Sequence, residues 1–71
     1  MLTLTWKQIE DGIWTGYDTA NVERGAVKLN DKGGWQPFET ERGFRVKRYG
    51  ETPSLDIAKW VVENRYHGDR G

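Results

Sequence analysis

The chain has 71 residues, of which 35% are hydrophobic, with 11 basic and 11 acidic side chains and a net charge of zero. This length allows one domain with a thin core, to which four Trp, three Tyr and two Phe contribute. The absence of cysteine excludes disulfides, thiolate metal sites and cysteine nucleophiles. No apolar run approaches the ~18 residues of a membrane span, and the N-terminus lacks the pattern of a secretory signal. We therefore expect an intracellular, cytoplasmic protein with no membrane partner.

Short apolar and β-branched segments, separated by turn residues, predict an antiparallel meander of four or five strands. Alternation places Leu2, Leu4 and Trp6 on one face of the first strand. Gly16 indicates a bulge or a close crossing in the second. Pro37 has no N–H to donate, so the fourth is expected to be an edge or a bulged strand. The expected strands are 1–7, 13–20, 26–30, 35–39 and 44–49, joined at 10–12, 21–25, 31–34 and 41–43.

The remaining sequence predicts one helix that ends at Gly68. Thr52 is expected to be the N-cap and Pro53 the first helical residue. At about 100° per residue, the apolar side chains fall on one half of the helix, which suits it to cover one sheet face. These side chains are Leu55, Ile57, Ala58, Val61, Val62 and Tyr66. The expected fold class is therefore α+β, an antiparallel meander with one C-terminal helix packed on one face, followed by a flexible tail at 67–71.

The expected last strand, GFRVKRYG at 43–50, is rich in basic and aromatic residues. Alternation directs Phe44 and Val46 toward the helix and leaves Arg45, Lys47 and Tyr49 on the open face. The expected core therefore joins Leu55, Ala58, Val61 and Val62 of the helix to Leu4, Trp6, Val27 and Phe44 of the sheet.

Cations along a strand, together with an aromatic side chain, suit a nucleic-acid backbone. The residues of this interpretation are Arg42, Arg45, Lys47, Arg48 and Tyr49. The other interpretation is a solvated edge strand, on which Lys and Arg prevent pairing between sheets. The sequence favours the edge strand, because the pI of about 6.6 is below the values typical of nucleic-acid-binding domains.

The reactive side chains argue against an enzyme. Ser54 and His67 are the only serine and histidine, and a helix would place them about 20 Å apart, whereas a nucleophile and its base lie about 3 Å apart. Ser54 is expected to help cap the helix, and one histidine does not make a metal site. Glu10 and Asp11 are neighbours in a turn rather than carboxylates opposed across a cleft. We expect no catalytic residue, metal site, cofactor or small-molecule substrate.

A tryptophan on the polar side of the predicted helix is the other anomaly. Trp60 lies among polar side chains, and tryptophan is enriched at the energetic centres of protein interfaces. The predicted protein-binding surface therefore consists of Trp60, Asp56, Glu63 and Asn64. In the alternative, Trp60 packs on a loop of its own chain at 20–25. The sequence leaves both interpretations open.

Charge is distributed unevenly along the chain. Residues 1–41 carry four basic and seven acidic side chains (4 − 7 = −3), and residues 42–71 carry seven and four (7 − 4 = +3). This asymmetry indicates either a polar patch for a partner or head-to-tail docking of two copies. Because the core is thin, we expect a homodimer at moderate concentration.

The order of motifs resembles that of small phage- and prophage-encoded proteins. The motifs are Trp6, IWTG at 13–16, GAVKL at 25–29, GGWQPF at 33–38 and SLDIAKWVVEN at 54–64. The resemblance implies a small sheet closed by a helix with a Leu-x-x-Ala-Lys signature. It also implies an accessory role that depends on binding another macromolecule, in the first place a host or phage protein.

A fainter similarity connects the chain to the sheet-plus-helix domains with which some phage integrases hold arm-site DNA. That similarity implies that basic and aromatic side chains of the sheet enter a DNA groove. The acidic first half of this chain departs from that pattern, so DNA binding is the second expectation.

Overall fold

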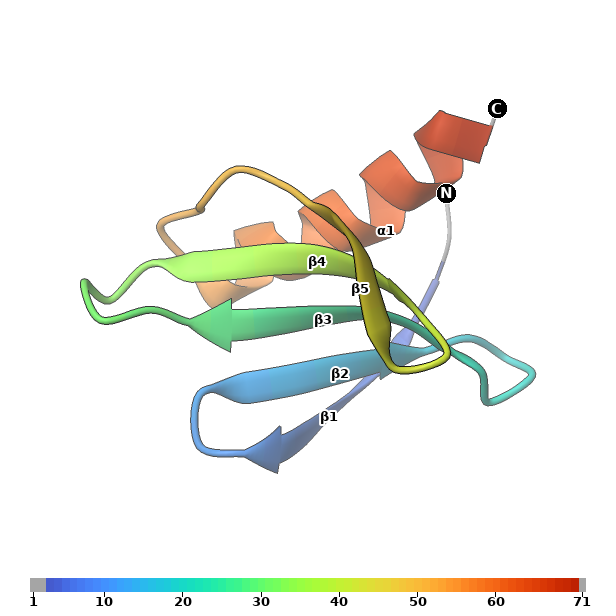
Figure 1. The fold of residues 1–71 in the computed structure, drawn as a ribbon, viewed down its shortest axis with the longest axis horizontal. Coiled ribbons are helices and arrows are strands. Elements are labelled where there is room, and N and C mark those ends of the chain that lie inside the picture. The colour runs from blue at the N-terminus through green and yellow to red at the C-terminus, as the bar shows by residue number, and fades with distance from the viewer. Residues whose placement is uncertain (1–2, 71) are drawn as a thin grey trace.

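The protein is described by a computed structural model of residues 3–70, with side chains for residues 3–64. The five strands form one antiparallel sheet in the order β1-β2-β3-β4-β5, and one helix follows them (Figure 1). The elements are β1 (Thr5–Glu10), β2 (Ile13–Tyr17), β3 (Glu23–Leu29), β4 (Trp35–Glu41), β5 (Phe44–Arg48) and α1 (Leu55–Arg70). The predicted α+β meander is confirmed. Within residues 3–70, no helix is long and apolar enough to cross a membrane.

Helix α1 packs across β3 and β4, and the core lies between these elements. Val27 and Val62 are completely buried at its centre, with Leu4 and Ala58 beside them. Gly25 allows this close approach, because a Cβ at that position would overlap with Val62 Cγ1. The predicted packing of Ala58 and Val62 on Leu4 and Val27 is therefore confirmed, and Trp6, Trp35 and Leu55 pack around this core. The predicted core residue Val61 is only partly buried.

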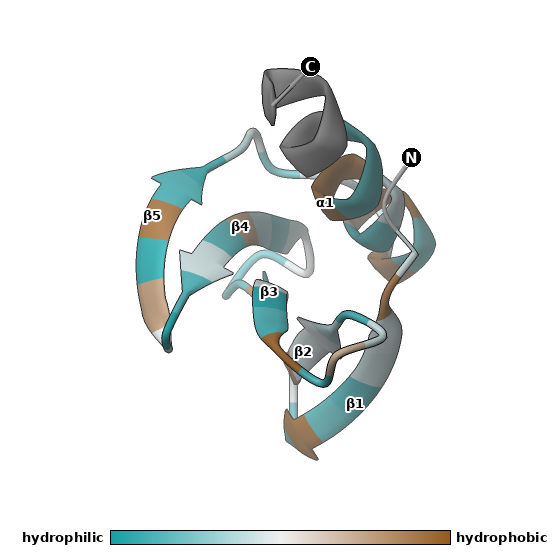
Figure 2. Ribbon diagram, turned by 90° about the vertical axis from the view of Figure 1, so that its right-hand side faces the viewer, coloured by the Kyte–Doolittle hydropathy of each residue, from teal (hydrophilic) through white to brown (hydrophobic). Residues whose placement is uncertain are grey.

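The last strand lies apart from the helix, which corrects one part of the predicted core. In the described part of the chain α1 packs on β3 and β4 and not on β5, and Figure 2 shows β5 standing away from α1. Phe44 is consequently 75% exposed and Val46 is 52% exposed. The prediction that these two side chains meet the helix is wrong, because β5 is the edge strand beyond β4, outside the part of the sheet on which α1 packs.

The first half of the sheet differs from the prediction at its strand ends. β1 runs to Glu10, so the turn begins at Asp11, and the predicted strand residue Leu2 lies outside the described residues. β3 begins at Glu23, inside the predicted loop 21–25. Gly16 has both predicted features: the register shifts beside it, and a Cβ would lie 2.9 Å from Leu4 Cδ1.

Asp18 explains why the loop before β3 is short. Its Oδ1 atom accepts hydrogen bonds from the backbone N–H groups of Ala20 and Val22, both at 2.9 Å. Its Oδ2 atom accepts one from Arg24 Nε at 2.8 Å. These bonds, with the one from Arg24 contributing most, lower the pKa of the Asp18 carboxyl. The loop is thus closed by one carboxylate, and strand pairing resumes at Glu23.

The helix begins later than predicted and extends further. Ser54 is its N-cap, since Ser54 Oγ accepts a hydrogen bond from the N–H of Ile57 at 3.2 Å. Thr52, the predicted N-cap, instead pairs with Trp35 through two backbone hydrogen bonds of 2.8 Å. The helix continues to Arg70, past the predicted end at Gly68.

Ile57 is 45% exposed, so its predicted place on the buried half of the helix is wrong. The side chain of Tyr66 lies outside the described residues, as does the end of the predicted flexible tail at residue 71.

Pro37 lies in an interior strand, because β4 pairs with β3 on one side and β5 on the other. Of the two predicted alternatives the edge strand is therefore wrong, whereas the β4–β5 pairing does contain a register shift between Glu39 and Thr40. The Pro37 carbonyl accepts a hydrogen bond from the N–H of Tyr49 at 3.0 Å, so its backbone groups face away from its β3 partner Val27. At that point β5 has already ended. The missing N–H therefore removes no hydrogen bond from the β3–β4 ladder.

Candidate functional site

A β-bulge in β5 decides which basic side chains share a face of the sheet. Lys47 lies opposite Glu39 and Arg45 lies opposite the next residue of β4, Thr40, so Val46 is an extra residue in β5. Directly paired residues project from the same face. Arg45 and Lys47 therefore point to opposite faces, and the prediction that they share the open face is wrong.

The face opposite the helix carries a row of paired residues that crosses all five strands. Because Val27 faces the helix, its neighbours Ala26 and Lys28 face the other way. Successive pairings connect Lys7, Thr15, Ala26, Phe38 and Arg48 across the sheet. We call this side the open face. It places four cations at exposed strand positions, which are Lys7, Lys28, Arg45 and Arg48.

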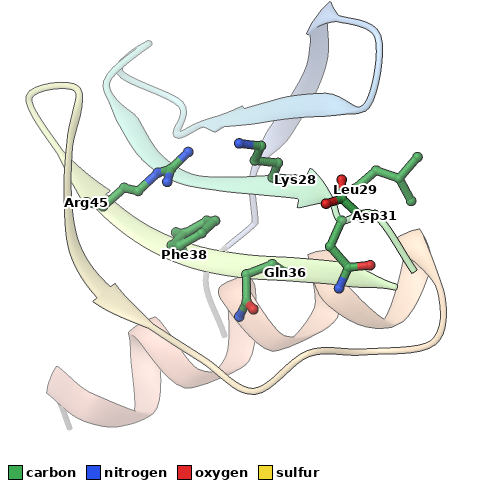
Figure 3. Close-up of a pocket in the computed structure, with 7 residues that line it drawn as sticks. Lys28, Leu29, Asp31, Gln36, Phe38 and Arg45 are labelled. Carbon is green, nitrogen blue, oxygen red and sulfur yellow. The ribbon is translucent and has the colours of Figure 1, made fainter. Parts of the chain in front are cut away.

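A shallow hollow of about 280 Å³ lies on the open face above β4. Figure 3 shows Arg45 from β5 and Lys28 from β3 pointing toward one another across it, with Phe38 beneath Arg45. The Arg45 guanidinium carbon is 4.2 Å from the centroid of the Phe38 ring. The hollow is lined by Lys28, Leu29, Asn30, Asp31, Gln36, Phe38 and Arg45. The hollow thus contains two cations, Lys28 and Arg45, beside the aromatic ring of Phe38, and the carboxylate of Asp31 lies at its far end.

Long side chains cover part of this face, which is the side of the sheet opposite α1. Phe38 is only 6% exposed, and Thr15 and Thr40 are 3% exposed. A guanidinium over an aromatic ring is an attractive contact of about 0.5–2 kcal/mol. The charge of Arg45 is therefore held in place above Phe38 rather than extended freely into solvent.

The other predicted nucleic-acid residues lie elsewhere. Tyr49 donates a hydrogen bond from its hydroxyl to Glu39 Oε2 at 3.0 Å, and Lys47 Nζ lies 5.1 Å from the Tyr49 ring centroid. Arg42 occupies the β4–β5 turn with a φ of 54°, beside a separate hollow lined by Glu41, Arg42, Phe44 and Val46. Of the five predicted residues, the open face thus brings together Arg45 and Arg48.

Sequence reasoning missed Lys28 and Lys7 as site residues. Both were recognisable in the sequence, since Lys28 follows the core position Val27 and Lys7 follows Trp6, so alternation sends each to the face away from the helix. The sequence did not reveal that β3, β4 and β5 lie side by side with Lys28 and Arg45 aimed at one hollow.

The predicted protein-binding residues do not form one exposed surface. Trp60 is 55% exposed, so a loop of its own chain does not bury it, and Asp56 is also exposed. Glu63 instead accepts hydrogen bonds at Oε2 from the N–H of Leu4 at 3.1 Å and from Trp6 Nε1 at 3.2 Å.

Asn64 donates a hydrogen bond to the Trp60 carbonyl within the helix at 2.8 Å. The solvent side of α1 is better described as Trp60 with Ile57, which is 45% exposed. These two apolar side chains are one turn apart on the same helix face.

The described residues contain no group of three or more His, Asp or Glu side chains arranged to hold a metal ion. Comparison with known proteins adds no further constraint, because no protein-family model, curated protein or solved structure matches this chain.

Proposed function

We propose that this chain is a small, non-catalytic nucleic-acid-binding protein that uses the open face of its sheet. The observation that supports this proposal is the arrangement around the hollow, where Lys28 and Arg45 converge over Phe38 (Figure 3). Lys7 and Arg48 add two further cations on the same face. Cations spaced along a surface neutralise successive phosphates, and this provides most of the affinity of sequence-independent binding.

The overall charge of zero does not oppose this proposal, because binding depends on the local field. Phosphates within about one Debye length, roughly 8–10 Å, respond to the nearest charges. The four cations of the open face lie within strands, whereas Asp31 lies in the turn at the end of the hollow. A partner that lies across β3, β4 and β5 would therefore meet a positive surface.

The test compares two double variants that each remove two positive charges. Lys28→Gln with Arg48→Gln removes cations of the open face, and Arg42→Asn with Lys47→Gln removes cations that lie off it. Binding of fluorescein-labelled ~12-nucleotide strands and duplexes is measured by anisotropy over a range of salt concentrations. Thermal unfolding verifies that both variants are folded.

We expect the open-face variant to bind more weakly and to flatten the log–log salt dependence. The slope should decrease by about 1.4 for single strands or about 1.8 for duplexes, because each lost phosphate contact contributes about 0.7 or 0.9. The control variant should retain most of the wild-type affinity and most of the wild-type salt slope. Equal losses in the two variants, or no binding by the wild type at about 50 mM salt, would contradict the proposal.

A protein partner is the second candidate, favoured by the exposure of Trp60 and Ile57 on α1. A host or phage protein that docks there would bury the indole, and truncation of such an anchor typically costs at least about 2 kcal/mol of binding free energy. Trp60→Ala should then abolish co-purification of a specific protein, whereas Ile9→Ala, at an apolar residue of β1 that is 58% exposed, should not. Loss of co-purification with both variants, or with neither of them, would contradict binding through Trp60 and Ile57.

A further inference from the structure

The hollow on the open face contains a planar charged group in addition to the ammonium group of Lys28. Arg45 presents a planar guanidinium whose one side rests on Phe38, 4.2 Å from the ring centroid. Figure 3 shows this group between Phe38 and the space that Lys28 approaches from the other strand. Because Phe38 is only 6% exposed, the surface available to a ligand is the guanidinium itself rather than the ring.

We propose that the hollow binds an unpaired base of a single-stranded nucleic acid, which stacks on the Arg45 guanidinium while Lys28 contacts a neighbouring phosphate. This inference rests on the proposed function and specifies its ligand. Unpaired bases commonly stack on arginine planes as well as on aromatic rings. Contact with Phe38 holds the plane of Arg45 in position, so less side-chain freedom is lost when a base stacks on it.

The lining of the hollow favours a base over a bare anion. Asp31 lies at the end remote from Arg45 (Figure 3), and its carboxylate would repel a phosphate that occupied the whole hollow. Carboxylates do accept hydrogen bonds from the exocyclic amino groups of bases. The hollow therefore combines a stacking surface and a cation at one end with an acceptor at the other.

The shape of the sheet opposes a duplex at the same site. Five strands spaced about 4.8 Å apart give a face about 19 Å wide, whereas the major groove of B-DNA is about 12 Å wide. β5 also passes in front of β4 in the view of Figure 1, so it stands between β4 and a duplex that approaches from that side. A paired base presents only its edge in a groove and cannot offer its flat side to Arg45.

The experiment uses three ~12-nucleotide ligands, a single strand, the same strand with abasic sites in place of its bases, and the corresponding duplex. Each is titrated with the wild type, with Arg45→Lys and with Arg48→Lys, and anisotropy is recorded. Arg45→Lys keeps the charge but removes the planar group, and Arg48→Lys makes the same exchange on the open face outside the hollow. Inorganic phosphate is added as a competitor to detect a simple anion site.

We expect the wild type to bind the normal strand about 5- to 150-fold more tightly than the abasic strand, as one stacked base provides. Arg45→Lys should lose that difference while its affinity for the abasic strand and its salt slope stay unchanged. Arg48→Lys should keep the difference. The affinities of the wild type for the normal and the abasic oligonucleotide are compared without any variant. This comparison therefore tests the inference even if Arg45→Lys fails to fold.

Three results would overturn this inference and differ in what they imply for the proposed function. Equal affinity for normal and abasic strands, or displacement by millimolar phosphate alone, would leave a nucleic-acid surface without a base site. Equal affinity for duplex and single strand would leave the proposed function standing and remove the preference for unpaired bases. Absence of binding to every ligand at low salt would remove both.

Discussion

The contact between Gly25 and Val62 allows a quantitative test of the core. A methyl group on residue 25 would overlap with Val62 Cγ1 and would lie 3.1 Å from the Phe38 carbonyl oxygen. Real carbon atoms do not approach so closely, so the Val62 side chain or α1 as a whole must shift when Gly25→Ala is made. Overpacking of this kind typically costs about 1–3 kcal/mol of unfolding free energy.

The complementary truncation removes the atom that the new methyl group meets. Val62 is completely buried, so Val62→Ala loses about 1.6 kcal/mol for two methyl groups plus the cost of the cavity, about 2 kcal/mol in total. In the double variant, the methyl group introduced at residue 25 occupies the space that Val62 Cγ1 leaves. The double variant should therefore be more stable than the sum of the two losses predicts, by about 1 kcal/mol or more.

Urea and thermal unfolding followed by tryptophan fluorescence measure these values. A loss of about 1 kcal/mol should lower the Tm by about 4–8 °C in a domain of this size. Gly50→Ala is the matched control, because a Cβ on Gly50 meets nothing within 4 Å. A neutral Gly25→Ala, or additive losses in the double variant, would refute the close packing of α1 on β3.

Three further predictions concern other contacts. Glu63→Ala should lower the unfolding free energy by about 1–3 kcal/mol in urea, since it leaves two N–H donors of the first strand region without their acceptor; equal stability of the variant would contradict this. The hydrogen bond from Arg24 lowers the pKa of Asp18, so the stabilisation is complete above the unfolded value of about 3.9 and is lost as the pH falls through the lower folded pKa. Asp18→Asn should therefore be less stable than the wild type at neutral pH, and acid titration of both should show this gap closing at low pH. Phe44→Ser should change stability by less than about 0.5 kcal/mol in the same urea assay, because the ring is 75% exposed; a loss above about 1 kcal/mol would show that the ring is packed.

Local chemistry made several elements predictable from the sequence. The turn at 31–34 is closed by Asn30, whose Oδ1 accepts hydrogen bonds from Lys32 and Gly34 N–H groups, both at 2.9 Å. Gly33 has the positive φ of 85° that such a turn needs. The apolar stripe of the helix and the crossing at Gly16 depend likewise on residue type and spacing. These signals lie within a few residues of one another, where sequence periodicity is informative.

The errors arose where a distant part of the chain decides the local structure. The bulge at Val46 is set by the pairing of β5 with β4, and it reverses the face of every cation on one side of it. Pro37 was expected in an edge or a bulged strand because its missing donor is visible in the sequence, whereas the end of β5 beside it is not. The candidate site lies at this junction, so its residues could be predicted only in part.

The order of elements along the chain also constrains how the nascent protein folds during synthesis. Ala58 and Val62, which cover the apolar side of the sheet, follow every strand. At about 5–20 residues per second, the ribosome needs about 2–7 s to proceed from Leu29 to Val62. Throughout that interval, Val27 and its neighbours have no helix to cover them. The apolar side of the sheet can therefore be closed only after α1 has been synthesised.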